Sequence, residues 1–275
     1  MTSVITPKVI EGVQQIRRMR GGSQAHLMRA SDGFFYIVKF QNNPQHVRVL
    51  ANEFFASRLG RWLGLPVPDV TPIEVSEWLI THTPDLHVET AGYQAQCSAG
   101  LQLASRFVAD PHQDLVFDYL PESLMIEKTH GIADFPRCLA FDKWTGNADG
   151  RQAVFSKKPR TTHYNVTFID QGYCFNCSEW TFPDLALQGV FFRNFVYQHV
   201  TGWHDFEPTL SRIEQMEYND IRAMAQGMPE EWYQSDSKAL SRLIYKLYER
   251  RSMVRGLITA FRNSCRNPFP NWAGH

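Results

Sequence analysis

The sequence predicts an α+β protein with a small β-rich N-terminal lobe and a mainly helical C-terminal lobe. Strand-like runs are concentrated in the first third of the 275 residues, whereas helix-like apolar stripes dominate the last hundred. The composition, 43% hydrophobic and 20% charged, is typical of a globular protein and not of a disordered chain. We expect residues 1–105 to form the first lobe and residues 106–275 the second.

The charge balance and the N-terminus exclude several classes of partner. The 28 Lys and Arg residues match the 28 Asp and Glu residues, so nothing indicates binding to nucleic acid or to an anionic membrane. No apolar run approaches the roughly 20 residues that cross a bilayer, and residues 1–8 lack the apolar core of a signal peptide. The five cysteines are few and odd in number, as expected for reduced thiols. We therefore expect a cytoplasmic protein without a membrane partner.

A glycine turn and a β-hairpin open the N-terminal lobe. Segment 20–24 contains Gly22 and Ser23 in a flexible turn. Two strand-like runs follow over 25–30 and 34–40. The Asp-Gly pair between them predicts a hairpin, because both residues tolerate positive φ.

Lys39 and Glu53 are the charged residues of this lobe that need an explanation. Lys39 lies near the end of the second strand, on the face that it shares with Phe35 and Ile37. A helix is predicted over 47–63 from apolar residues spaced three and four apart, and Glu53 lies at the edge of that apolar stripe. Taken alone, Lys39 could be a snorkelling residue and Glu53 a surface residue.

The middle of the chain contains two aspartates at the ends of predicted elements. Those elements are one or two strands over 70–80, a short strand or turn over 115–119, a helix over 135–144 and a strand over 164–169. Asp149 lies in the polar loop that follows the helix, and Asp170 directly follows the last strand. Taken alone, either aspartate could simply form a turn.

The last hundred residues predict helices. Ser235 and Asp236 can cap a long helix whose apolar stripe runs as far as Phe261. Between Arg242 and Arg266, seven basic residues accompany one acid. We interpret them as a solvated helix face, with a phosphate-rich partner as the alternative.

The order of these features fits phosphoryl transfer from ATP. A glycine turn lets backbone N–H groups approach phosphate, a lysine neutralises the phosphate charge, and a glutamate on a helix fixes that lysine. One aspartate orients the acceptor hydroxyl, and another holds magnesium across the phosphate oxygens. The glycine turn, Lys39, Glu53, Asp149 and Asp170 occur in this order.

The same residues resemble those of the HipA-like kinases and, more distantly, of the phosphatidylinositol kinases. The resemblance covers roughly residues 20–172 and continues loosely into the helical tail. The matching pieces are Phe35-Tyr-Ile-Val-Lys39, Asn52-Glu53 with the later Gly64-Leu-Pro-Val67, Asn147-Ala-Asp149-Gly-Arg151 and Phe168-Ile-Asp170-Gln-Gly172. The resemblance implies a bilobal protein-kinase-like fold with ATP and magnesium as cofactors. It also implies a protein Ser or Thr hydroxyl as the acceptor.

The resemblance also implies a role for each site residue. The implied roles are phosphate binding for Gly22, Ser23 and Lys39, support of Lys39 for Glu53, orientation of the acceptor for Asp149, and metal binding for Asp170.

One position departs from the family pattern. The metal-binding asparagine usually found five residues after the catalytic aspartate is Val154 here, which has no oxygen to offer magnesium. Gln152 or Asn147 could supply the ligand, Asp170 could hold a single metal with ATP and water, or the protein could transfer nothing. The last case makes a pseudokinase, acting as a nucleotide-binding or protein-interaction module, the alternative function. Transfer of a nucleotide is a third option.

Asp142 offers a second register for the catalytic aspartate. Asp142 and Asn147 are five residues apart, as in the catalytic loop of protein kinases. We favour Asp149, because Asp142 lies inside the predicted helix, where a carboxylate more often has a structural partner. Arg151 or Lys143 would be that partner.

Overall fold

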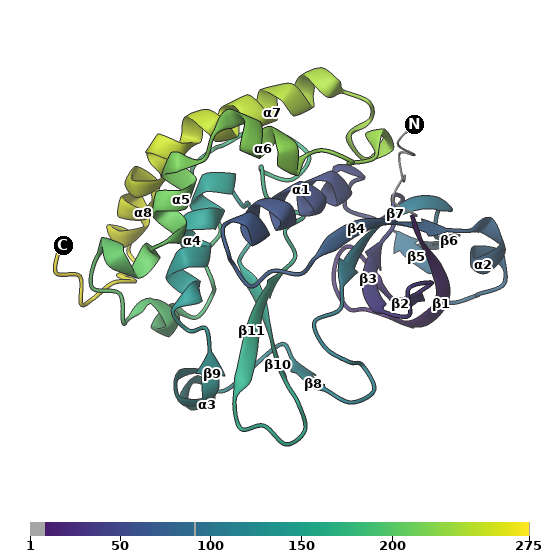
Figure 1. Cartoon of the computed structure of the whole chain (residues 1–275), viewed down its shortest axis with the longest axis horizontal. Coiled ribbons are helices and arrows are strands. Elements are labelled where there is room, and N and C mark those ends of the chain that lie inside the picture. Colours follow the sequence, from purple (N-terminus) through teal and green to yellow (C-terminus); the bar gives the residue numbers. More distant parts are fainter. Residues whose placement is uncertain (1–8, 91, 275) are drawn as a thin grey trace, which may run out of the picture.

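The computed structural model describes residues 9–90 and 92–274 of the chain. Its first part is a closed five-stranded barrel in the order β1-β2-β3-β7-β4. Figure 1 shows the barrel at one end of the molecule and the α-helices from α4 onward at the other. The barrel strands are β1 (Ile10–Arg18), β2 (His26–Ala30), β3 (Phe35–Lys39), β4 (Val70–Val75) and β7 (Gly100–Arg106).

The predicted hairpin is confirmed as β2 and β3. The two strands pair antiparallel, with Met28 opposite Tyr36, and Gly33 of the turn has a φ of +85°. The glycine turn differs from the prediction in its context, because it joins β1 to β2 and so lies in a hairpin of its own. Sequence patterns did not reveal β1.

The first long helix is also confirmed, as α1 (Arg48–Trp62). The described residues form two separate apolar clusters, one inside the barrel and one among the helices. The apolar stripe of α1, including Leu50, Phe54 and Leu59, belongs to the helical cluster. Because α1 directly follows β3 and packs on the helices, it connects the two parts of the fold.

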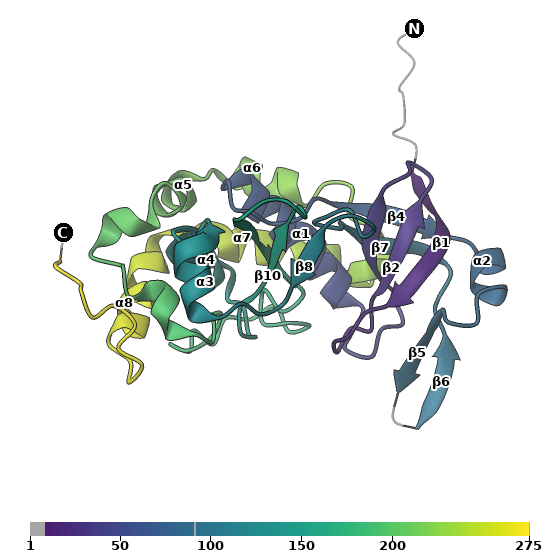
Figure 2. The same cartoon turned by 90° about the horizontal axis from the view of Figure 1, so that it is seen from below.

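The prediction of strands over 70–80 is half wrong. Only β4 is a strand, and the chain then forms α2 (Glu77–Thr81). The Ser76 hydroxyl starts this helix by accepting a hydrogen bond from the backbone N–H of Leu79 at 3.2 Å. A two-stranded hairpin, β5 (His87–Thr90) and β6 (Tyr93–Gln96), projects from the barrel in Figure 2 and was not predicted.

A second sheet carries the two acidic loops. Its strands, in the order β8-β10-β11-β9, are β8 (Leu115–Phe117), β10 (Gln152–Lys157), β11 (Tyr164–Ile169) and β9 (Thr129–His130), and α3 (Glu122–Lys128) precedes β9. Strand β11 has the predicted bounds. Strands β10 and β11 form an antiparallel hairpin in which Gln152 pairs with Ile169. The residues just before β10 and just after β11 therefore lie at the same end of this hairpin.

The helical part begins with α4 (Asp134–Thr145), which ends at Gly146 as predicted, with that glycine in the left-handed region. The remaining elements are η1 (Asn194–Tyr197), η2 (Trp203–Phe206), α5 (Thr209–Gln215), α6 (Tyr218–Met224), η3 (Glu230–Tyr233), α7 (Ser237–Arg250), η4 (Arg251–Met253) and α8 (Val254–Arg262). The single long helix expected near the C-terminus is thus two helices separated by a 3₁₀ turn. Asp236 caps the first of them, as predicted.

Several basic residues near the C-terminus are used inside the fold. Arg250 forms a bidentate pair with Asp184, and Arg255 pairs with Glu214. Arg251 donates to backbone carbonyl groups. These contacts leave less free positive charge on α7 and α8 than their sequence suggests. In the described part of the chain, no helix combines the length and the apolar character that crossing a bilayer requires.

Candidate active site

A buried lysine joins two carboxylates from distant parts of the chain. Lys39 is the last residue of β3 and is only 5% exposed. Its Nζ donates to Oε2 of Glu53 on α1 and, at 2.8 Å, to Oδ1 of Asp170 after β11. The structure thus brings together three residues that the sequence singled out.

Lys39 and Asp170 stabilise each other's charges, whereas burial raises the pKa of Glu53 above its ordinary value. Burial by itself would lower the pKa of Lys39, but the carboxylates of Asp170 and Glu53 outweigh it and raise that pKa above its ordinary value. The positive charge of Lys39 in turn lowers the pKa of Asp170. Lys39 is therefore a cation and Asp170 an anion at neutral pH. Both charges are held in place where a phosphate and a metal ion could meet them.

Asp170 has a special backbone conformation and a second neighbour. Its φ of +60° is in the left-handed region, which residues with side chains seldom adopt outside functional or tightly constrained sites. Its Oδ2 accepts a hydrogen bond from Nε2 of Gln152 at 3.3 Å. Gln152 and Val154 are alternate residues of β10 and so point to the same face of the sheet. Gln152 therefore places an amide beside Asp170, whereas the side chain of Val154 has no polar atom to offer.

The arrangement suits a cation that takes few protein ligands. Within the described residues, no three or more His, Cys, Asp or Glu side chains gather where they could hold a metal ion. Magnesium commonly binds one or two carboxylates and fills its other positions with water and substrate phosphates. The Asp170 carboxylate fits that requirement, whereas the Gln152 amide presents its nitrogen to Asp170 and would have to turn to add an oxygen.

Asp149 lies in the loop that leads into β10, and its side chain is exposed. Asn147 Oδ1 accepts a hydrogen bond from the Asp149 backbone N–H at 3.2 Å, and Asp149 Oδ1 accepts one from the N–H of Gly150 at 2.7 Å. No ion pair among the described residues involves this carboxylate. Asp149 is at the same end of the β10–β11 hairpin as Asp170, and its carboxylate is free to meet a substrate hydroxyl.

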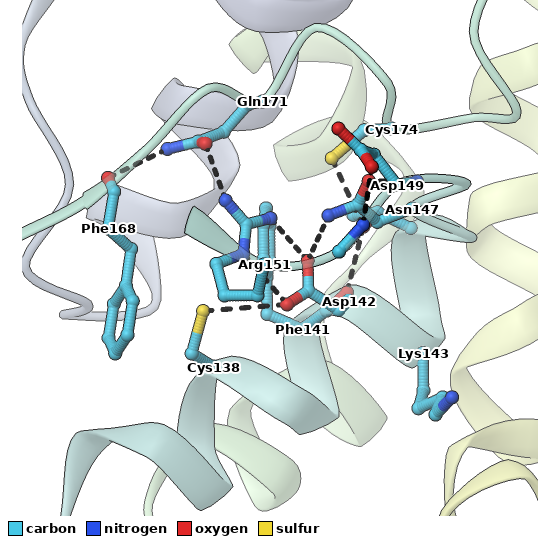
Figure 3. Close-up of polar contacts among 12 residues, drawn as sticks. Cys138, Phe141, Asp142, Lys143, Asn147, Asp149, Arg151, Phe168, Gln171 and Cys174 are labelled. Atoms are coloured by element: carbon cyan, nitrogen blue, oxygen red, sulfur yellow. Dashed lines mark hydrogen bonds and ion pairs between the residues drawn. The ribbon is translucent and has the colours of Figure 1, made fainter. Parts of the chain in front are cut away.

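Asp142 is the centre of a buried structural network (Figure 3). It is 1% exposed and forms a bidentate ion pair with Arg151, whose Nε donates to Oδ2 at 2.9 Å. Asn147 Nδ2 donates to its other oxygen at 3.0 Å. Arg151 also donates to the Ile169 carbonyl and to Gln171 Oε1. The network ties the loop before β10 to the turn after β11.

Arg151 is thus the partner expected for Asp142, whereas Lys143 is not. The Nζ of Lys143 donates to the carbonyl oxygens of Ala186 and Gln188, at 2.8 and 2.6 Å. Lys143 therefore anchors the segment that follows the second acidic loop.

The glycine turn stands apart from this cluster. Gly22 and Ser23 lie between β1 and β2, and Gly22 faces the side chain of Gln45, in the loop before α1. A Cβ added at Gly22 would lie 2.7 Å from Nε2 of Gln45. Among the described residues, no hydrogen bond joins Gly22 or Ser23 to Lys39 or Asp170.

Sequence reasoning missed the residue next to Glu53. Asn52 is completely buried, and all three of its side-chain hydrogen bonds go to the loop after Asp170. The Asn-Glu motif contains Asn52 without giving it a role, and a polar residue on an otherwise apolar helix face is the signal that could have indicated one.

Comparison with known proteins agrees with this geometry. A family model described as HipA-like kinase matches residues 13–257. Among solved structures, the proinflammatory kinase CtkA of Helicobacter pylori has a TM-score of 0.56 and 15% identity, over 94% of this chain and 99% of that chain. The Golgi casein kinase with Mn/ADP bound has a TM-score of 0.51 and 11% identity, over 93% of this chain and 74% of that chain.

A chain of the toxin–antitoxin complex of HipA, HipB and operator DNA from Shewanella oneidensis MR-1 is also similar. Its TM-score is 0.51 and its identity 13%, over 96% of this chain and 76% of that chain. No curated protein gives a match. At these identities the structural likeness shows a shared kinase-like fold.

Proposed function

Because the chain belongs to the HipA-like kinase family, we propose that it transfers a phosphoryl group from ATP to a Ser or Thr hydroxyl of a protein. The observation that carries the proposal is Lys39, buried between Glu53 and Asp170. Phosphoryl transfer needs such a lysine, held by a helix glutamate beside a metal-binding aspartate. Desolvation offsets much of the attraction among three buried charges, so a contribution to stability does not explain why they lie here.

Each residue of the cluster has a role that its surroundings support. Lys39 would neutralise charge on the ATP phosphates while Glu53 keeps it in place. Asp170, ionised by its neighbour, would hold magnesium, with the amide oxygen of Gln152 as a second ligand. Asp149 would orient the acceptor hydroxyl, since its carboxylate faces solvent. Bound magnesium would supply positive charge that offsets the negative charge of the phosphates.

The nucleotide site would lie in a cleft between two lobes. We place the cleft between an N-lobe of residues 1–105, which contains the apolar cluster of the barrel, and a C-lobe of residues 106–275, whose apolar cluster also takes in α1 of the N-lobe. Strand β7 ends at Arg106, next to the proposed boundary. Gly22 and Ser23 would line the phosphates from the β1–β2 turn, where glycine lets backbone N–H groups approach closely.

A protein acceptor is supported by the segment beside the catalytic loop. The N–H of Gly189 donates to the Asp149 carbonyl at 3.1 Å, so this segment directly borders the loop. On it, Leu185, Leu187 and Phe192 are 60%, 47% and 62% exposed, which provides apolar surface for a peptide near Asp149. All five cysteines are free thiols, which fits the reducing cytosol as the site of action.

The decisive experiment is calorimetric titration of ATP, with and without magnesium, into the wild type and Asp170→Asn. The proposal expects magnesium-dependent binding that the variant loses. Phosphate release from ATP should then disappear in Asp149→Asn. The absence of ATP binding under both conditions would contradict the proposal.

The alternative is a pseudokinase, and Val154 is the observation that favours it. A pseudokinase would bind ATP without releasing phosphate, and Asp149→Asn would change nothing. Release of phosphate by the wild type excludes this alternative. Mass spectrometry of the modified acceptor separates phosphoryl from nucleotide transfer.

A further inference from the structure

A second connection between α1 and the loop after β11 lies beside Lys39 and carries no charge. Asn52 is completely buried in the middle of α1. Its Nδ2 donates to the carbonyl oxygens of Gly172 at 2.8 Å and Cys177 at 2.7 Å. Its Oδ1 accepts a hydrogen bond from the indole Nε1 of Trp180 at 2.7 Å. Both amide hydrogens are therefore used, and every bond of this side chain leaves the helix for one loop.

The loop that Asn52 holds has a strained backbone. Phe175, Asn176, Cys177 and Trp180 all have φ values between 51° and 61°. Residues with side chains disfavour this left-handed region, and consecutive examples persist only where the surroundings over-determine them. The bonds from Asn52 to two carbonyl groups and one indole of the loop provide such a constraint.

Helix α1 also packs directly against this loop. A Cβ added at Gly172 would lie 2.5 Å from Cγ1 of Val49, so only glycine fits between the helix and the loop. The guanidinium of Arg48 donates to the carbonyl of Ser178 at 2.8 Å and lies 4.7 Å from the ring centroid of Trp180. Arg48 and Val49 of α1 therefore both contact the loop that Asn52 binds.

We propose that Asn52 is a positioning residue that keeps Glu53 aligned with Asp170 when Lys39 moves from Asp170 to a nucleotide phosphate. The inference rests on the proposed function. In the structure Lys39 links the two carboxylates, and its transfer to phosphate removes one of these ionic contacts. Asn52 directly precedes Glu53 in α1, and Gly172 lies two residues after Asp170. The uncharged link therefore preserves the spacing between helix and loop while the charges rearrange.

The test compares Asn52→Ala with Ser57→Ala. Ser57 is equally buried on α1, but its Oγ has no hydrogen-bond partner, so its removal breaks no hydrogen bond. Hydrogen exchange followed by mass spectrometry reports on residues 48–55 and 170–181, and calorimetry reports the affinity for ATP with magnesium. Asn52→Ala should speed exchange in both segments and weaken ATP binding by at least about tenfold. Ser57→Ala should do neither.

Trp180→Phe adds a finer measurement, because it removes the indole N–H but keeps an aromatic ring under Arg48. We expect it to weaken ATP binding less than Asn52→Ala. Adding it to Asn52→Ala should cause little further loss, because both changes break the same contact.

Three results decide the proposal. Unchanged exchange in the loop of Asn52→Ala would overturn it. Faster exchange with undiminished ATP affinity would also overturn it, because Asn52 would then have a purely structural role. If the wild type binds no ATP, the proposed function fails and this proposal fails with it, whereas either of the first two results in a wild type that binds ATP overturns this proposal alone.

Discussion

Asp142 and Asp149 can be separated by one pair of substitutions, because their carboxylates have opposite surroundings. Asp142 is buried against Arg151 and also accepts a hydrogen bond from Asn147. Asp149 is exposed. Asp142→Asn therefore leaves a buried guanidinium without its counter-charge, whereas Asp149→Asn changes a group that faces solvent.

The expected magnitudes follow from these surroundings. Breaking one side of a buried ion pair costs about 3–5 kcal/mol. The Arg151 guanidinium keeps its hydrogen bonds to the Ile169 carbonyl and Gln171, so we expect the lower figure, about 3 kcal/mol. In a chain of this size, that loss lowers the melting temperature by about 5 °C. Asp149→Asn should change stability by less than about 0.5 kcal/mol and slow phosphate release by at least about 100-fold.

Thermal unfolding and a phosphate-release assay measure both quantities on the same samples. A double variant, Asp142→Leu with Arg151→Leu, is the control, because removing both charges should restore much of the stability that Asp142→Asn loses. If Asp142→Asn melted like the wild type but released no phosphate, Asp142 would be the catalytic aspartate and the assignment of Asp149 would be wrong.

Three further substitutions test other parts of the site. Gly172→Ala should lower both melting temperature and ATP affinity, because its Cβ would lie 2.5 Å from Val49 Cγ1, and adding Val49→Ala should restore part of each. Burial lowers the pKa of Lys143 to about 8, so the unfolded chain binds more protons between that pH and the ordinary pKa of 10.5. The stability of the wild type relative to Lys143→Met should therefore rise by up to about 3 kcal/mol over this range in urea titrations, and a flat difference would contradict the reasoning. Gln152→Ala should raise the magnesium concentration needed for ATP binding several-fold and Gln152→Glu should lower it; equal requirements would exclude Gln152 as a ligand.

The elements predicted best are those whose signals are local. Strand β11 has the expected bounds, and α1 and α4 match within a residue or two, because apolar periodicity and terminal glycines lie in the segments themselves. The predicted helix after Asp236 extends too far, since the apolar stripe continues across the break at η4. A stripe of apolar residues shows which face is buried, but it does not show whether the backbone stays helical.

The missed strands depend on distant partners. β1 is half-exposed and rich in polar residues, and it exists because it closes the barrel between β2 and β4. β7 lies between β3 and β4, and its four consecutive residues 102–105 are buried, so both of its faces are covered and the alternation that marks a half-buried strand is absent. Neither property can be recognised from the segment alone.

The candidate site likewise contains residues that the sequence could identify and contacts that it could not. Lys39, Glu53 and Asp170 could be identified because charged residues at the ends or edges of apolar elements are conspicuous, and the structure brings them together. The partners of Asn52 could not be identified, because two of them are backbone carbonyl groups, at Gly172 and Cys177, which every residue possesses. Residue types carry information about side-chain chemistry and little about which backbone groups will meet it.

The contacts of Asp170 indicate how nucleotide and metal would depend on each other. One carboxylate oxygen accepts a hydrogen bond from Lys39 and the other accepts one from Gln152, so a cation at Asp170 would compete with these two donors. A phosphate that attracts Lys39 frees one oxygen of Asp170 and supplies further oxygen ligands at the same time. In the proposed function ATP would therefore complete a metal site at Asp170, and the missing oxygen at Val154 would make the protein more dependent on this contribution. The departure from the family pattern thus favours joint binding of magnesium and ATP over a metal bound in advance.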